Sequence, residues 1–220
     1  AYLSTLQTDV NGSESPYATD VGEIQNALPR WGTLHEPGYP LYSLSGALAV
    51  TALRAAGIEP AAGASLFSML WALATVAALY GTARELGLAR PWAASGATVA
   101  GLGTSQWMDA SLAEVHTMGT ALAALALLAA LRYARSGRRT DLLLLVAAFC
   151  HGAVHQRTLL FLGPALLVVL WPRRREALRH WRSGVAVALT APIPYLYLPA
   201  RAWLGSGWQF GQVGEWRGFL

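Results

Sequence analysis

Residues 64–82 read ASLFSMLWALATVAALYGT, an apolar run without a charged side chain. A helix needs about 20 mostly apolar residues to cross the hydrocarbon core of a bilayer, so this run predicts a membrane-spanning helix. Outward from it, further apolar segments approach the same length, at residues 92–108, 113–131, 141–156, 158–171 and 184–199. The sequence therefore predicts an all-α polytopic membrane protein with about six spans.

The composition also places the chain in lipid. Hydrophobic residues make up 54% of it and charged residues 13%, whereas soluble domains carry about 25% charged residues. The mean hydropathy is +0.36. The arginines lie between the apolar runs and form no single basic face, which argues against a nucleic-acid partner. The single cysteine, Cys150, excludes an intramolecular disulfide.

The basic residues predict the orientation in the membrane. All 16 are arginines, and 11 of them fall in three loops, residues 83–91, 132–140 and 172–182. The positive-inside rule therefore predicts that these loops are cytoplasmic. The connections between them carry most of the acids and would face the outside. Because a chain rich in alanine, leucine and arginine but without lysine is typical of GC-rich bacterial genes, we expect a multi-pass protein of the bacterial inner (plasma) membrane.

Segment 41–57 resembles a further span, but it is short and contains Arg54. If it crossed the membrane, every later loop would change sides and the arginine-rich loops would lie outside. We therefore expect a juxtamembrane helix along the external surface. The expected parts are an external loop with this helix (1–63), a transmembrane bundle (64–200) and an external tail (201–220). We expect the segment to belong to a longer protein, with a further helix before it and a further region after it.

The polar stretch 19–42, TDVGEIQNALPRWGTLHEPGYPLY, contains the strongest candidate site. It places Asp20, Glu23 and His35 just before the apolar part of the chain, where ionisable groups typically bind a charged ligand or perform chemistry. A helix capping box is the alternative for the two carboxylates, with Asp20 accepting a backbone N–H and Glu23 reaching back. The sequence leaves both interpretations open.

Two further clusters lie at the predicted external boundary. Glu114 and His116 begin the span at 113–131, where a cavity is one interpretation and favourable interaction with the helix dipole is the other. Tyr197 and Arg201 end the last span. They indicate either a substrate contact or an interfacial aromatic belt with an arginine that extends to water.

His155 and Arg157 lie in the short polar turn between two predicted spans. His151 precedes His155 by one helical turn, a spacing that permits a metal pair. Without a clear third ligand, an interhelical hydrogen bond is the favoured role for His151.

Four motifs carry a resemblance to a known family. They are Asp20-x-Gly22-Glu23, His35-x-Pro37-Gly38-Tyr39-Pro40-Leu41-Tyr42, Ala113-Glu114-Val115-His116-Thr117 and Tyr195-x-Tyr197-x-Pro199-x-Arg201. In this order they resemble a bacterial and animal membrane family of unknown-function domains related to protein O-mannosyltransferases, in the C-type glycosyltransferase superfamily. The chain departs from it at Glu36, where the family commonly has proline, and at His116, where it commonly has tyrosine.

The resemblance implies a C-type glycosyltransferase-like transmembrane helix bundle with an external catalytic loop. It implies transfer of a mannose-like sugar from a polyprenyl-phosphate donor to a protein or glycan hydroxyl at the external membrane face. Inverting transfer needs one carboxylate to take the acceptor's proton, and we assign Asp20 as this base, with Glu23 orienting it or the acceptor. The expected substrate-binding residues are His35, Tyr39, Glu114, His116, His155, Arg157, Tyr197 and Arg201.

The lipid-phosphate leaving group needs a cation, and Arg157 and Arg201 are the candidates. We assign no metal ligands, although a divalent cation is an alternative. The expected partners are the bilayer, the polyprenyl-phosphate sugar and the acceptor. A non-catalytic membrane protein that binds or transports a lipid-linked substrate is the rival function, but such proteins more often place ionisable groups at mid-membrane.

Overall fold

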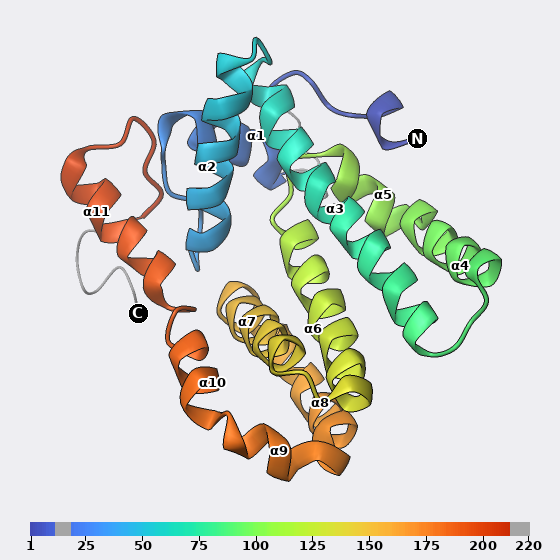
Figure 1. Cartoon of the computed structure of the whole chain (residues 1–220). Helices are drawn as coiled ribbons and strands as arrows, with labels where there is room; N and C mark the ends of the chain where they lie inside the picture. The colour runs from blue at the N-terminus through green and yellow to red at the C-terminus, as the bar shows by residue number, and fades with distance from the viewer. Residues whose placement is uncertain (12–18, 212–220) are drawn as a thin grey trace. The chain divides into compact units, whose positions relative to one another are not determined.

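The computed structural model describes residues 1–11 and 19–211, and this part of the chain forms helices joined by loops, without a strand (Figure 1). This confirms the all-α prediction. The chain divides into two compact units that alternate along the sequence. Unit 1 comprises Ala1–Ala72, Thr104–Thr117 and Pro194–Leu220, and unit 2 comprises Leu73–Gly103 and Met118–Ile193. Residues 212–220 of the expected external tail lie outside the described residues.

Three helical stretches in the described part of the chain are long and apolar enough to cross a membrane. They are α3 (Pro60–Glu85), α6 (His116–Ser136) and the stretch Trp181–Leu204. The first contains the predicted span 64–82, and the second covers the predicted span 113–131 except for its first three residues. In unit 2, large apolar side chains such as Phe161 and Val168 are 86% and 73% exposed. Apolar surface of this kind fits contact with lipid better than contact with water.

Two other predicted spans are interrupted. Segment 92–108 divides at Gly103, which is extended and separates α4 (Arg90–Leu102) from α5 (Thr104–Ser111). Segment 184–199 divides between α10 (Trp181–Ala188) and α11 (Tyr197–Leu204). Pro192 and Pro194 lie in this second interruption, and proline removes a helical N–H donor and clashes with the preceding turn.

The two remaining predicted spans, 141–156 and 158–171, form short helices. Segment 141–156 corresponds to α7 (Arg139–His155), which has 17 residues. Segment 158–171 consists of a 3-10 helix, Arg157–Leu162, followed by α8 (Gly163–Leu170). Pro164 stands in the first turn of α8, where its missing N–H and fixed φ are tolerated. A further short helix, α9 (Arg174–Arg179), leads to α10.

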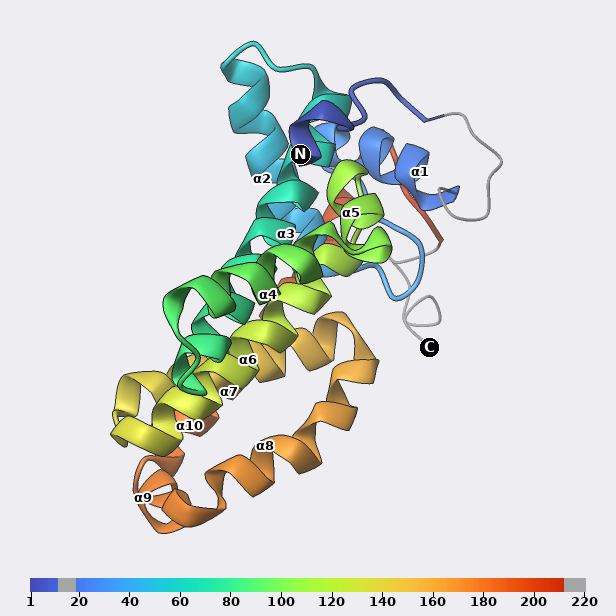
Figure 2. The same ribbon diagram turned by 90° about the vertical axis from the view of Figure 1, so that its right-hand side faces the viewer.

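In unit 2, α6 lies beside α7 and the end of α3 (Figure 2), and small residues lie at the contacts between these helices. Ala78 of α3 is buried against Ala124 and Leu128 of α6, and a Cβ at Gly81 would lie 2.9 Å from a Leu128 methyl carbon. On α7, a Cβ at Gly152 would lie 3.2 Å from Cβ of Leu122. Small side chains at helix contacts allow close backbone approach, the usual way in which membrane helices pack.

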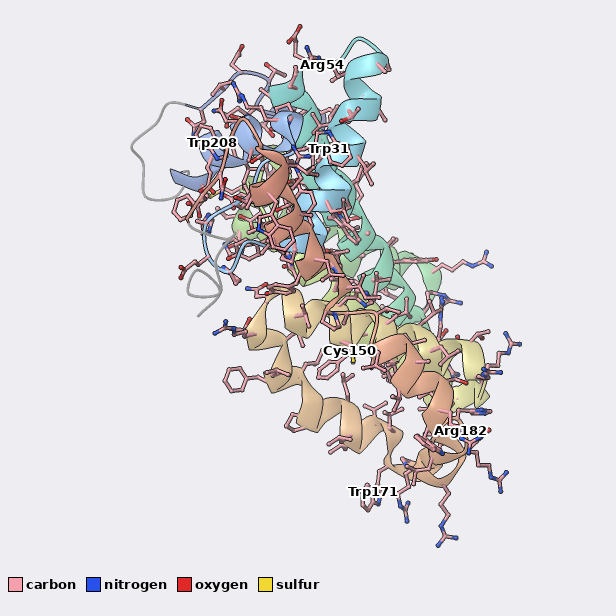
Figure 3. All side chains as sticks on the ribbon, turned by 90° about the vertical axis from the view of Figure 1, so that its left-hand side faces the viewer. Trp31, Arg54, Cys150, Trp171, Arg182 and Trp208 are labelled. Carbon is pink, nitrogen blue, oxygen red and sulfur yellow. The ribbon has the colours of Figure 1, made fainter. Side chains whose placement is uncertain are left out.

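In unit 1, α1 (Thr19–Ala27), α2 (Pro40–Ala55) and α11 lie around the loop that joins α1 to α2 (Figure 1). The helix expected at 41–57 is therefore present as α2. The Tyr197 hydroxyl donates to the Gly32 carbonyl at 3.0 Å, and Arg201 Nε donates to the Trp31 carbonyl at 2.8 Å. The Trp31 end of this loop also lies near Trp208 (Figure 3), whose carbonyl accepts the Thr33 N–H at 3.3 Å.

The loop turns sharply at Gly38, which has φ +84°. Only glycine adopts this conformation readily, and a Cβ here would lie 2.8 Å from a methyl carbon of Leu198. The Gly38 N–H donates to the His35 carbonyl at 2.7 Å. The turn brings the rings of His35 and Tyr39 to a centroid distance of 5.4 Å.

We predict that Gly38→Ala destabilises the protein more than Gly57→Ala does. Both positions have nearly the same φ, +84° and +85°, so each variant carries a similar strain of about 1–3 kcal/mol. A Cβ at Gly57 meets nothing within 4 Å, whereas one at Gly38 meets Leu198. Thermal unfolding in detergent measures the difference, and equal losses of stability would contradict a role for the Leu198 contact.

Candidate active site

Glu23 holds His35 with both carboxylate oxygens. The His35 backbone N–H donates to Oε1 at 2.6 Å, and His35 Nδ1 donates to Oε2 at 3.0 Å. A capping box would instead use a Glu23 oxygen for an N–H at the start of α1. Asp20 lies inside the first turn of α1. The two carboxylates therefore do not form a capping box.

The second ring nitrogen of His35 faces Asp20. Nε2 lies 3.6 Å from Asp20 Oδ2, and the side chains of His35 and Asp20 are 22% and 41% exposed. This distance is long for a hydrogen bond but suits an ion pair. The hydrogen bond from Glu23 is the main cause that raises the pKa of His35; burial opposes it, and the charges of Glu23, Asp20 and Glu114 add to the rise.

Glu114 is a buried carboxyl group coupled to this cluster. Its residue is 6% exposed, and burial raises its pKa to about 8, with Asp109 and Asp20 adding to the rise and His35 opposing it. Ser68 of α3 fixes its backbone, accepting the Glu114 N–H at 2.9 Å and donating to the Glu114 carbonyl at 3.1 Å. A pKa near 8 favours the protonated carboxyl at neutral pH, and a protonated carboxyl is able to donate a hydrogen bond.

Aromatic rings complete the surroundings of His35. Tyr39 and Phe210 meet its ring edge-to-face at centroid distances of 5.4 Å and 6.1 Å. Burial raises the pKa of the Tyr39 hydroxyl, and the negative charges of Asp20, Glu114 and Glu23 raise it further. Tyr39 therefore stays protonated beside the acids.

Three other predicted site residues also lie in unit 1. His116 is exposed at the start of α6, and its charge opposes the burial that raises the pKa of Asp109. Tyr197 and Arg201 are bonded to the loop that carries His35, through the carbonyls of Gly32 and Trp31.

His155 and Arg157 belong to unit 2. His155 is 2% exposed at the end of α7, and Arg157 is exposed in the next turn. His151 bonds through Nδ1 to the Ala147 carbonyl of its own helix at 2.9 Å. The expectation of an interhelical bond was wrong for His151, because the carbonyl one turn back lies within reach.

Sequence reasoning missed Ser68 and Tyr42. The Tyr42 hydroxyl donates to Ser68 Oγ at 2.8 Å, linking α2 to the residue that fixes Glu114. The available signal was a serine within an apolar helix, since a polar group there needs a partner. Asp109, whose charge adds to the raised pKa of Glu114, was also not among the predicted site residues.

Asp20, Glu23 and His35 also form a possible cation site. Each offers a ligand atom, and these atoms lie within 4.8 Å of one another. Among the described residues, no other group of three or more histidine, cysteine or acidic side chains meets this criterion. Two carboxylates and an imidazole suit divalent ions such as Mn²⁺ or Zn²⁺.

Together these features define a helical membrane protein with a carboxylate–histidine site on the segment that precedes its long helices. Residues 20–178 match the family described as "Protein O-mannosyl-transferase TMEM260 N-terminal domain", and the chain belongs to this family. This confirms the relation to O-mannosyltransferases inferred from the motifs.

A curated relative extends the comparison. The chain is 24% identical over 212 residues to mouse (Mus musculus) "Protein O-mannosyl-transferase TMEM260", an alignment covering 91% of this chain and 30% of that protein. The chain thus spans less than a third of this relative's length. No solved structure matches the chain.

We predict that the pKa of His35 lies above its ordinary value of about 6.5. The stabilisation from this histidine is complete below that value and is lost as pH rises through the raised pKa. Because the bond from Glu23 is the largest cause, Glu23→Gln should lower the His35 pKa more than Asp20→Asn. Histidine NMR titration in micelles measures both shifts, with His35→Gln assigning the signal. A larger effect of Asp20→Asn would contradict the assigned geometry.

Proposed function

We propose that this chain forms part of an inverting glycosyltransferase. It would move a mannose-like sugar from a polyprenyl-phosphate donor to a hydroxyl acceptor at the external membrane face. The observation that carries the proposal is the Glu23–His35–Asp20 arrangement, a half-exposed carboxylate beside a histidine held by a second carboxylate. Family membership supports glycosyl transfer in general. The donor, the inversion and the residue roles are our proposal.

In this mechanism Asp20 is the base. Its carboxylate removes the acceptor hydroxyl proton while the hydroxyl oxygen attacks the anomeric carbon of the sugar. The bond from that carbon to the phosphate oxygen breaks, and the electron pair leaves with the polyprenyl phosphate. Attack opposite to the leaving group inverts the configuration. Asp20 is suited to this role because it is exposed to an incoming acceptor.

His35 and Glu23 position the base. His35 Nε2 lies 3.6 Å from Asp20 Oδ2, so a protonated His35 draws this carboxylate toward one place. The two hydrogen bonds from Glu23 hold the His35 ring in that orientation. Glu23 thus acts through His35, whereas the sequence predicted that it orients Asp20 or the acceptor.

The other predicted residues receive substrate-binding roles. A protonated Glu114 and the Tyr39 hydroxyl supply donors to sugar hydroxyls. Arg201 uses Nε on the Trp31 carbonyl, and within the described residues no hydrogen bond of its Nη atoms to protein is found, so these remain for the donor phosphate. His116, His155, Arg157 and Tyr197 stay predictions for the lining of the substrate cavity.

A divalent cation on Asp20, Glu23 and His35 is the alternative means of neutralising the phosphate. A cation there would occupy the Asp20 oxygen that the base needs, so the two roles compete. Transfer that persists with excess chelator favours the base, and transfer that chelation abolishes and Mn²⁺ or Mg²⁺ restores favours the cation.

We predict that Asp20→Asn lowers transfer by about 10²–10⁴-fold, the usual contribution of a general base. The assay uses the full-length protein in nanodiscs with a panel of polyprenyl-phosphate sugars, and NMR of the product anomer tests inversion. Asp9→Asn is the matched control, because Asp9 is an exposed aspartate of the same unit outside the cluster. Its activity should equal the wild type.

Two outcomes would contradict the proposal. Full activity of a folded Asp20→Asn variant would remove Asp20 from the base role. Donor binding without turnover, unchanged by the substitution, would instead support a protein that binds or transports the lipid-linked substrate.

A further inference from the structure

The arginine-rich loops meet at one end of unit 2. Arg132 and Arg135, at the end of α6, bind Glu85 at the end of α3 with distances of 3.4 Å and 3.1 Å. Arg139 Nη2, at the start of α7, donates to Ser183 Oγ in the first turn of α10 at 2.6 Å. All three candidate spans therefore have one terminus here, at Glu85, Ser136 and Trp181.

Arg173 fixes the start of α9 against the end of α6. Its Nε donates to the Ala134 carbonyl at 2.8 Å and its Nη2 to the Arg135 carbonyl at 3.0 Å. These carbonyls belong to the last turn of α6, which lacks intrahelical donors. Nη1 of Arg173 binds Glu176 Oε2 at 2.8 Å. Gly137, at φ +66°, leaves room for this ion pair, since a Cβ there would lie 2.7 Å from Nη1 of Arg173 and 2.7 Å from Oε1 of Glu176.

These contacts form an open hollow of about 840 Å³ with an excess of positive charge. It is lined by Ala134, Pro172, Arg173, Arg174, Arg175, Glu176 and Arg179. The only acid in this lining, Glu176, is already paired with Arg173. Within the described residues, Arg175 and Arg179 form no salt bridge. The hollow is therefore matched to an anion such as a phosphate group, whose oxygens accept hydrogen bonds from arginine.

Exposed tryptophan and leucine side chains lie next to the arginines of the hollow, a combination typical of a membrane surface. Trp171 and Leu178 are 63% and 67% exposed, and the Arg174 guanidinium lies 4.5 Å from the Trp171 ring centroid. Trp171 and Arg182 lie at the same end of unit 2 (Figure 3). Tryptophan is enriched at the headgroup level of bilayers, and basic clusters next to spans bind anionic headgroups.

We propose that the hollow between α6 and α9 binds the phosphate headgroup of an anionic phospholipid. Arg175 and Arg179 are the phosphate ligands, and Arg173 is a positioning residue that holds α9 against α6. Trp171 and Leu178 contact the glycerol and upper acyl region of the same lipid. The site is independent of the proposed glycosyl transfer.

The test compares phosphatidylglycerol with phosphatidylcholine bound to the full-length protein, measured by native mass spectrometry at increasing lipid concentration. Arg175→Gln/Arg179→Gln should weaken phosphatidylglycerol binding about thirtyfold, because each arginine near the surface contributes about 1 kcal/mol. The matched control is Arg90→Gln/Arg138→Gln, which removes the same charge from the other two arginine-rich loops, outside the hollow. It should bind phosphatidylglycerol within about twofold of the wild type.

Each other outcome overturns the proposal. Equal weakening in both double variants would show nonspecific attraction to the whole basic end. Unchanged binding in a hollow variant that keeps the wild-type unfolding temperature would exclude the site. Inorganic phosphate that displaces phosphatidylglycerol at equal concentration would identify a free-anion site instead of a lipid site.

Discussion

The double hydrogen bond from Glu23 to His35 is the contact on which the candidate site depends. Glu23 lies on α1 and His35 on the following loop, and both oxygens of one carboxylate are used to join them. Without this contact the His35 ring would lose both its orientation and the main cause of its raised pKa. The remaining features, from the Gly38 turn to the bonds from α11, hold the loop in the place that this contact requires.

The candidate site has an excess of acidic groups, whereas the hollow has an excess of basic groups. In the site, carboxylates outnumber the histidine, and burial, together with the charges of Asp109 and Asp20, raises the pKa of the Glu114 carboxyl to about 8. In the hollow, arginines outnumber Glu176, and they remain charged because guanidinium does not deprotonate in proteins. Excess negative charge near exposed Asp20 suits proton removal from an acceptor, and excess positive charge beside exposed tryptophan suits a lipid headgroup.

The sequence predicted the parts of the fold that composition alone determines. Residues 64–82 and 116–131 are mostly apolar and contain no proline, and both lie within long helices. The division at Gly103 was not predicted, because the break separates two segments that apolarity does not distinguish. Pro192 and Pro194 were the signals for the break in segment 184–199, because proline interrupts a helix even within an apolar run.

The sequence predicted which residues form the site better than it predicted how they are arranged. Asp20, Glu23 and His35 lie in one short polar stretch, so they could be identified as candidates. Their spacing alone could not distinguish a capping box from a histidine held by Glu23. The distinction depends on the loop path, which Tyr197 and Arg201 fix from more than 160 positions away. Ser68 was missed for the same reason, since its partner Glu114 is 46 residues distant.

A double-mutant cycle on transfer tests the central claim most directly. Glu23→Gln, His35→Gln and the double variant would be compared with the full-length wild type by kcat/KM for the same donor and acceptor. If Glu23 acts through His35, the double variant should be no slower than the His35→Gln variant, giving a coupling free energy equal to the Glu23→Gln effect. Strictly additive losses would show that Glu23 and His35 act separately, and would contradict the account of how Asp20 is positioned.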